Sequence, residues 1–191
     1  MSNVEATLMG RRLLILGPPG AGKGTQATVL CRAIGIPHIS TGEMLRDHVA
    51  RETALGRRAR EIMESGDLVP DEIVIGMVEE RIGQPDAACG FLLDGFPRTR
   101  AQAEALDEVL GDEGLDAVIV VEVAEDELVE RILKRGRSDD TEEAVRNRLT
   151  VYHSQTAPLI EFYLGRGLVR SVDGVGAIEE VLARIVGVLG A

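Results

Sequence analysis

A glycine-rich segment between an apolar run and a helical pattern constrains the fold most. Residues 13–16 read as a buried strand, and the letters GPPGAGKGT follow at residues 17–25, where a helix expected over 22–34 begins. Glycines let backbone N–H groups curl around a phosphate, and the start of a helix adds about half a positive charge. Strand, loop and helix in this order predict a nest for a nucleoside triphosphate, with Lys23 at its terminal phosphates.

The alternative interpretation of this loop is a tight strand-to-helix turn, in which the glycines relieve steric crowding and Lys23 is merely solvated. The flanking strand and helix favour phosphate binding. One departure from the general phosphate-binding loop is informative, because Gly24 follows Lys23 and the hydroxyl residue Thr25 comes one position later. This spacing restricts the families of phosphate-binding-loop proteins to which the chain can belong.

Short apolar runs alternate with amphipathic stretches along the rest of the chain. We expect strands near residues 13–16, 37–39, 91–93, 117–123 and 168–172. We expect helices near residues 22–34, 42–52, 55–65, 71–83, 99–110, 125–135, 141–164 and 176–189. The alternation predicts an α/β fold, with a parallel sheet and helices on both of its faces. The stretch 40–69 has helical pieces but no strand, so we expect it to be inserted between the second and third strands.

Local chemistry marks some boundaries. Ser40 with Glu43 three residues later has the pattern of a capping box, and Asp71 is a candidate N-cap. Residues 1–10 have no periodic pattern, so we expect a loose tail ahead of a single domain over 11–191.

Composition excludes several classes of protein. With 45% hydrophobic and 28% charged residues, a chain of 191 residues can bury a core without metal or disulfide, which excludes disorder. Cys31 and Cys89 lack C-x-x-C spacing, which excludes a zinc ribbon, and we expect both to be buried in a reducing, cytoplasmic protein. We expect neither a membrane span nor a signal peptide. The net charge of −11 argues against nucleic-acid binding, so a polyanion would bind only locally.

A second group of polar residues follows the strand expected at 91–93. Asp94 comes at the carboxyl end of that strand, where α/β sheets bind ligands, and a carboxylate there can hold Mg²⁺ or its waters. Arg98, on the turn that follows, can form two hydrogen bonds with a second phosphate. The alternative interpretation of Asp94 is that it binds no ligand and only stabilises the turn before Gly95.

With these residues, the sequence resembles the adenylate kinase family of nucleoside monophosphate kinases from Arg12 to nearly the C-terminus. The matching blocks, in order, are GPPGAGKGTQ, ISTGEMLR, GDLVPDE, GFLLDGFPRTRAQ and the RSDD…RNRL…YHSQTAPLI stretch. The resemblance implies a P-loop nucleotide-binding core with a five-stranded parallel sheet. It also implies a helical monophosphate-binding insert at about 40–69 and a very short lid at about 135–145.

The resemblance also assigns roles to individual residues. ATP would be bound by Gly20, Ala21, Gly22, Lys23, Gly24, Thr25, Arg131, Arg135 and Gly176. AMP would be bound by Thr41, Arg46, Asp67, Leu68, Val69, Gly95, Phe96, Pro97, Arg98, Gln102, Arg137 and Arg148. The catalytic residues would be Lys23, Arg98, Arg131, Arg137 and Arg148. Mg²⁺ would arrive with ATP and be held by Asp94 through water, and no zinc is expected.

The arginines near the lid have a simpler interpretation. Arg131 and Arg135 are four residues apart, which puts both on one helical face, where they could be solvated and paired with Glu127 and Glu130. Their place in the resembling block favours ATP contact.

The lid itself is short. Only three residues separate Arg135 from Asp139, which leaves no room for a four-cysteine zinc knuckle and little protein to exclude water from ATP. Asp139 and Asp140 would orient the arginines or cap the helix that follows.

The resemblance implies Mg²⁺-dependent, reversible phosphoryl transfer from ATP to AMP giving two ADP, in a cytoplasmic monomer. GTP stays open as an alternative donor. A UMP or CMP kinase is the nearest alternative, but it usually has Ala where Thr41 stands and Asn where Gln102 stands. A P-loop switch is less favoured because the guanine-reading N-K-x-D motif is absent, and a purely structural role less still. We expect no catalytic role for His38, His48 or His153, because this chemistry needs no histidine base.

Overall fold

The computed structural model describes residues 10–137 and 140–190, except for the side chains of Leu133 and Arg135. The tail expected over 1–10 therefore lies, apart from Gly10, outside the described residues, as do two residues of the expected lid, 138 and 139. Within the described ranges, no helix is both long and apolar enough to cross a membrane.

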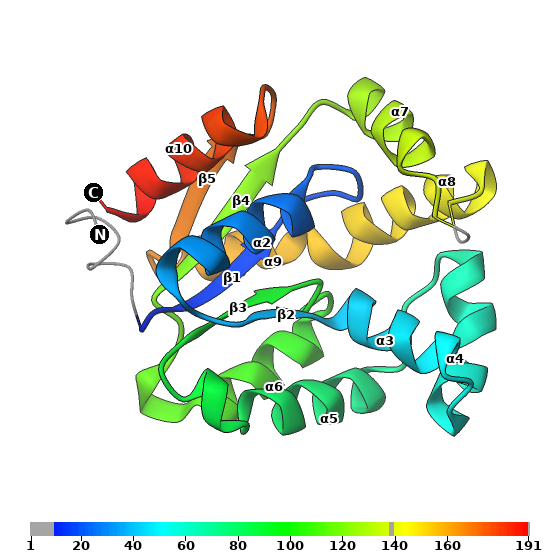
Figure 1. Ribbon diagram of the computed structural model, residues 1–191, viewed down its shortest axis with the longest axis horizontal. Coiled ribbons are helices and arrows are strands. Elements are labelled where there is room, and N and C mark those ends of the chain that lie inside the picture. The colour runs from blue at the N-terminus through cyan, green and yellow to red at the C-terminus, as the bar shows by residue number, and fades with distance from the viewer. Residues whose placement is uncertain (1–9, 138–139, 191) are drawn as a thin grey trace.

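A sheet of five parallel strands forms the centre of the molecule, in the order β2-β3-β1-β4-β5 (Figure 1). The strands are β1 (Arg12–Leu16), β2 (His38–Ser40), β3 (Phe91–Asp94), β4 (Ala117–Glu122) and β5 (Val169–Asp173). The expected parallel α/β sheet is confirmed. In its register Asp94 pairs with Ser40 on one side and with Ile15 on the other, so three strands end together at one edge.

Both faces of the sheet are covered by helices, as its apolar strands require. In β1, Leu13 and Ile15 pack against one helical layer, whereas Leu14 and Leu16 face the other. The first layer contains α2 (Lys23–Ile34), α7 (Glu125–Arg135) and α10 (Ile178–Leu189). The second layer contains α3 (Thr41–Ala50), α4 (Ala54–Ser65), α5 (Asp71–Ile82), α6 (Arg100–Leu110) and α9 (Pro158–Leu164). Two short 3₁₀ turns, η1 (Pro85–Ala87) and η2 (Gly111–Glu113), precede β3 and β4.

The prediction of one continuous α-helix over 141–164 is wrong. The segment instead consists of α8 (Glu142–Val151), a π-helical turn η3 (Tyr152–Thr156) and α9. Pro158 has no N–H and cannot make the α-helical bond to residue 154, and the N–H of Ala157 bonds to the carbonyl of Tyr152, five residues back. The proline was the signal for this break.

Three smaller expectations also fail. Ser40 is the N-cap of α3 but makes no side-chain capping bond, because it is also the last residue of β2 and its direction is set by the strand. Pro70, not Asp71, is the N-cap of α5, and the Asp71 carboxylate bonds to α6 and its cap instead. Cys31 is buried as expected, and its burial raises the pKa of its thiol to about 12, but Cys89 is exposed before β3.

The helices α3 and α4, which follow β2, pack very closely at Gly56. A Cβ atom at Gly56 would lie 2.0 Å from the backbone carbonyl oxygen of His48, at the end of α3. Gly76 in α5 is the matched opposite, because a Cβ there meets nothing within 4 Å. One glycine is thus needed for packing, and the other only weakens its helix.

We expect Gly56→Ala to lower the free energy of unfolding by about 1–3 kcal/mol, because the two helices must separate. Gly76→Ala should raise it by about 0.5–1 kcal/mol through higher helix propensity. Urea denaturation of both variants checks this pair. Equal effects of the two substitutions would contradict the close packing of α3 and α4.

Candidate active site

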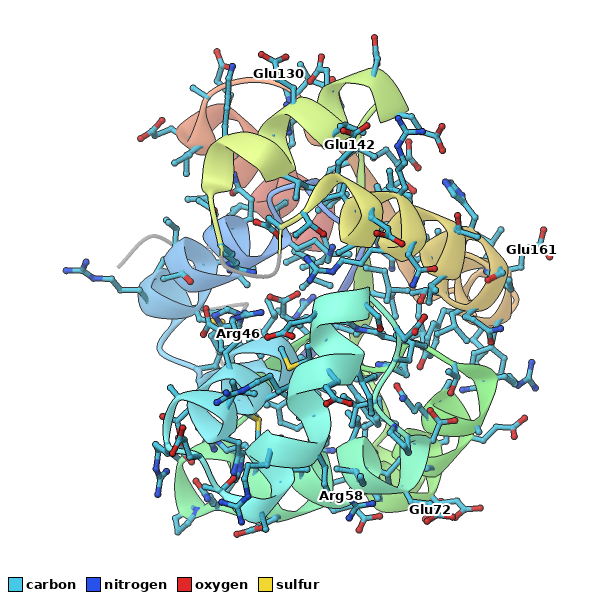
Figure 2. All side chains as sticks on the ribbon, turned by 90° about the vertical axis from the view of Figure 1, so that its right-hand side faces the viewer. Arg46, Arg58, Glu72, Glu130, Glu142 and Glu161 are labelled. Atoms are coloured by element: carbon cyan, nitrogen blue, oxygen red, sulfur yellow. The ribbon has the colours of Figure 1, made fainter. Side chains whose placement is uncertain are left out.

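A cleft of about 640 Å³ opens where β1, β2 and β3 end. Its walls come from the loop before α2 and from residues of α3, α4, α7, α8 and η3. Figure 1 shows α3, α4, α7 and α8 gathered at the same end of the molecule, to the right of the sheet. In Figure 2, Arg46 lies near the middle of the view, whereas Glu130 and Glu161 lie at its edges.

The glycine-rich loop forms one side of the cleft. Helix α2 begins at Lys23 with Gly22 as its N-cap, and its first turn carries no acidic side chain, so the positive end of the helix is not neutralised locally. At Gly20 the backbone has φ 84°, and a Cβ there would lie 2.8 Å from the carbonyl oxygen of Leu128 in α7. The Lys23 ammonium donates to the loop carbonyls of Gly17 and Pro18, at 2.7 and 2.8 Å.

Asp94 lies at the carboxyl end of β3 with a side chain that is 12% exposed. Burial raises the pKa of this carboxyl, but the hydrogen bond from His38 and the charges of Lys23, His38 and Arg98 outweigh burial, so the pKa of Asp94 is lowered overall. The carboxylate is therefore ionised at neutral pH. Lys23 and Arg98, from different segments of the chain, thus act with His38 on one buried acid.

His38 is the partner of Asp94 that sequence reasoning missed. Its Nε2 lies 3.3 Å from Asp94 Oδ2, and its Nδ1 lies 3.4 Å from the hydroxyl of Thr28 in α2. The ring therefore links α2 to the end of β3. Only the position of His38 at the start of β2, beside β3 in a parallel sheet, could have indicated this contact.

The turn after β3 forms the second side of the cleft. Arg98 Nε donates to the carbonyl of Gly95 at 2.7 Å, and the Thr41 hydroxyl donates to the same carbonyl at 2.8 Å. Burial lowers the pKa of Arg98, the charge of Asp94 raises it, and the charge of Arg148 lowers it. A guanidinium group stays protonated in proteins at neutral pH, so Arg98 stays charged. These contacts fix the direction of its guanidinium group.

Helices α7 and α8 supply the third side. Arg131 donates to Glu127 at 2.8 Å, as the simpler interpretation suggested, and also to the carbonyl of Gly174 at 3.2 Å, yet it still lines the cleft. Arg148 of α8 donates to the buried carboxylate of Asp140 at 2.9 Å. Asp140 also accepts from the backbone N–H of Arg137 at 3.2 Å, so this carboxylate joins the start of the segment to α8.

Contacts across the cleft join α8 to the end of α4. Asn147 Nδ2 donates to Asp67 Oδ1 at 2.7 Å and to the carbonyl of Ser65 at 3.0 Å, and Arg148 donates to the carbonyl of Met63 at 3.2 Å. Hydrogen bonds from Asn147 and Ser65 lower the pKa of Asp67. The structure is thus partly closed over the cleft at this side.

The charge of the cleft is opposite to that of the chain. The chain carries a net charge of −11, but its cleft is lined by more cations than anions. The cations are Lys23, Arg46, Arg98, Arg131, Arg137 and Arg148, and the anions are Glu43, Asp67 and Asp94. A local site for a polyanion, as the sequence predicted, is what this arrangement favours.

Most of the residues predicted for the site lie around this single cleft. The further predicted residues that line it are Gly20, Gly22, Gly24, Thr25, Thr41, Leu68, Val69, Gly95, Pro97 and Gln102. Ala21 and Phe96 are buried at 2% and 1% exposure and do not line it, and neither does Gly176 in the turn before α10. The side chain of Arg135 lies outside the described part of the structure.

The turn η3 contributes cleft residues that no sequence pattern indicated. Tyr152 and Thr156 both line the cleft. The hydroxyl of Thr156 donates to the backbone carbonyl of Arg98 at 2.9 Å, which ties the turn after β3 to η3. The π-helical turn rotates these side chains relative to a continuous α-helix.

The residues present fit a magnesium ion that is bound together with a nucleotide. Mg²⁺ is usually held by one or two carboxylates, substrate phosphates and water. Asp94 supplies one ionised carboxylate, and Thr25 supplies a hydroxyl on the same cleft wall as Lys23. Among the described residues, no three His, Cys, Asp or Glu side chains are grouped to hold a metal by themselves.

The contribution of the contact between His38 and Asp94 can be tested by measuring the free energy of unfolding. We expect His38→Leu to lower the free energy of unfolding at pH 7 by about 1–3 kcal/mol, because it leaves a buried carboxylate without its partner. His153→Leu is the control, because His153 is half exposed and pairs with an exposed Glu125, so its loss should cost less than about 0.5 kcal/mol. Urea denaturation that finds equal effects would contradict the role given to His38.

Comparison with known proteins identifies the family. The sequence model described as adenylate kinase matches residues 15–168. The chain is 57% identical to an adenylate kinase of Xanthomonas euvesicatoria, over 94% of this chain and 99% of that protein. It is 53% identical to one of Nocardia farcinica over 94% and 99% of the two chains, and 52% identical to one of Thermus thermophilus over 95% and 98%. The chain belongs to the adenylate kinase family.

Proposed function

We propose that this cleft carries out reversible, Mg²⁺-dependent transfer of the γ-phosphoryl group of ATP to AMP, giving two ADP. Membership of the family makes the chain a phosphotransferase. The observation that best supports the site is the position of Asp94, which is close enough to both Lys23 and Arg98 for their charges to lower its pKa. A donor phosphate held by the first cation and an acceptor phosphate held by the second would meet there.

On the donor side, the loop Gly20–Thr25 would hold the phosphates of ATP. Backbone N–H groups at the start of α2 suit a phosphate, and Lys23 would move from its loop carbonyls to the terminal phosphates. Ala21 would act through its backbone, and Gly176 through its backbone near adenine. Mg²⁺, held by Asp94 through water, would neutralise phosphate charge and orient the chain of phosphates.

On the acceptor side, AMP would occupy the wall formed by α3, α4 and the turn after β3. Arg46 and Arg98 would bind its phosphate, and Thr41 and Gln102 would face its base. The remaining contacts would come from Asp67, Leu68, Val69, Gly95, Phe96 and Pro97, largely through the backbone. We propose that residues 40–69 form the monophosphate-binding unit and that residues 135–145 form a lid within a single domain.

The chemistry requires little from side chains beyond alignment and charge. Phosphoryl transfer passes through a loose transition state with negative charge on the peripheral oxygens, so preorganised cations lower its energy. Arg131, Arg137 and Arg148 would surround the transferred group together with Lys23 and Arg98. Arg135 would contact ATP, and Asp140 holds the guanidinium group of Arg148 and the backbone of Arg137 in position.

We propose that the protein acts as a cytoplasmic monomer and that ATP is the donor, with GTP as the alternative. A kinase for UMP or CMP would use the same cleft. A nucleotide switch would not need the second cationic wall around Arg98.

The reaction is tested by chromatography of the products formed with Mg²⁺, ATP and either AMP, UMP, CMP or no acceptor. We expect two ADP per AMP consumed and little turnover otherwise. Lys23→Met should lower kcat at least about 100-fold, because it removes a preorganised cation. The chain's other lysine, Lys134, pairs with Glu130 on the outside of α7, so Lys134→Met should retain activity.

The other outcomes of this experiment are distinct. UMP or CMP turnover in place of AMP turnover would move the substrate but keep the fold. ADP and free phosphate without an acceptor would indicate that the short lid admits water, or that the site serves a switch. Full activity in Lys23→Met would contradict the assignment of the donor loop.

Acceptor selectivity is a separate test. We expect Thr41→Ala combined with Gln102→Asn to lower the preference for AMP over CMP and UMP by at least about tenfold, because both side chains would face the base. The ratio of kcat/KM values is the measurement. Unchanged AMP selectivity in a folded double variant would refute the placement of the base.

A further inference from the structure

The side-chain amide of Gln102 is held by two groups of opposite hydrogen-bonding character. The backbone N–H of Arg98 donates to Gln102 Oε1 at 2.7 Å, and Gln102 Nε2 donates to Asp71 Oδ1 at 2.7 Å. A backbone N–H can only donate, and an ionised carboxylate can only accept. The two partners therefore allow one orientation of the amide and oppose the flipped one.

Asp71 is itself fixed from a second direction. Its other carboxylate oxygen, Oδ2, accepts from the hydroxyl of Thr99 at 2.9 Å, and Thr99 is the N-cap of α6. The same hydroxyl accepts from the backbone N–H of Gln102 at 3.2 Å. Asp71, Thr99 and Gln102 thus form a closed arrangement between the starts of α5 and α6. Gln102 is 2% exposed, so its amide has little freedom to turn toward water.

The held amide still has one N–H and one oxygen lone pair to offer, and it lines the cleft. A glutamine amide in this state matches an adenine edge, where an amino group that donates lies beside a ring nitrogen that accepts. A 6-oxopurine carries a carbonyl oxygen in place of the amino group. Opposite the fixed Oε1, that carbonyl would bring two acceptors together.

We propose that Asp71 is a specificity-positioning residue, which holds the Gln102 amide in the orientation that accepts a 6-aminopurine monophosphate and rejects a 6-oxopurine monophosphate. This inference rests on the proposed function, in which Gln102 faces the acceptor base. Without Asp71, the amide would keep its bond to the Arg98 N–H but lose the partner on its Nε2. Turning the amide to present Nε2 to a carbonyl would then break only the bond to the Arg98 N–H, so discrimination should fall without being abolished.

The test compares AMP with IMP as acceptors, using purified full-length protein, ATP and Mg²⁺. In Asp71→Asn the new amide can either accept from Gln102 Nε2 or donate to Oε1, so only the Arg98 N–H still favours the original orientation. We expect the ratio of kcat/KM for AMP to kcat/KM for IMP to fall about tenfold. Glu72→Gln is the matched control, because Glu72 is an exposed acid in the same first turn of α5, and its ratio should stay at the wild-type value.

The ratio separates positioning from general damage. A purely structural role for Asp71 would lower turnover of both acceptors together and leave the ratio within twofold of wild type, which would overturn the inference. If Asp71→Asn does not fold, Asp71→Ser decides by the same criterion, because a serine hydroxyl can both donate and accept and so does not enforce one amide orientation. In a Gln102→Leu background the Asp71 substitution should leave the ratio unchanged, and a further fall there would also overturn the inference.

A failure of the proposed function would look different. Wild-type protein that does not convert AMP to ADP would refute the reaction itself. Wild-type protein that converts AMP, combined with an unchanged ratio in Asp71→Asn, would refute only the role of Asp71.

Discussion

The crowding of positive charge at the edge of a buried sheet is the constraint on which the rest of the structure depends. Six cationic side chains line one cleft in a chain whose net charge is −11. Like charges at this density repel, and the structure offsets the repulsion with specific partners. Asp94 lies near Lys23 and Arg98, Asp140 bonds to Arg148, and the phosphate loop supplies carbonyls to Lys23. Bound phosphates would complete this compensation, which would let one acidic chain select polyanions at one place.

The parallel sheet determines where these charges meet. Strands β2, β3 and β1 end side by side, so His38, Asp94 and the loop after Leu16 converge although the sequence separates them. Side chains on the helices then hold the groups that line the cleft in fixed orientations. The cleft wall at Gln102 is held by a chain of hydrogen bonds from Thr99 through Asp71 to Gln102, and the opposite wall is held by the bond between Asp140 and Arg148. Both walls use carboxylates to orient the groups that would touch substrate, so under the proposed function selectivity and catalysis would depend on the same kind of contact.

Much of the fold could be predicted because the spacing of apolar residues and the positions of glycines can be read from short stretches of the sequence. Five short apolar runs predicted the five strands of the sheet, and the order of strand, loop and helix located the start of α2. The π-helical turn was missed because helical periodicity alone was followed across Pro158. The partners His38 and Asp71 were missed for a different reason. Their roles depend on strand order and on the meeting of two helix N-termini, and neither is visible in the spacing of residues along the chain.

The central claim is that donor and acceptor nucleotides share one cleft, with their phosphates meeting around Lys23, Asp94 and Arg98. It is tested most directly by calorimetric titration with a bisubstrate analogue, two adenosines joined by five phosphates, in the presence of Mg²⁺. We expect one analogue molecule per chain, competition with both ATP and AMP, and an affinity well above that of either nucleotide alone, because one molecule fills both subsites. Binding of two analogue molecules per chain, or an analogue that leaves AMP binding unaffected, would contradict the shared cleft.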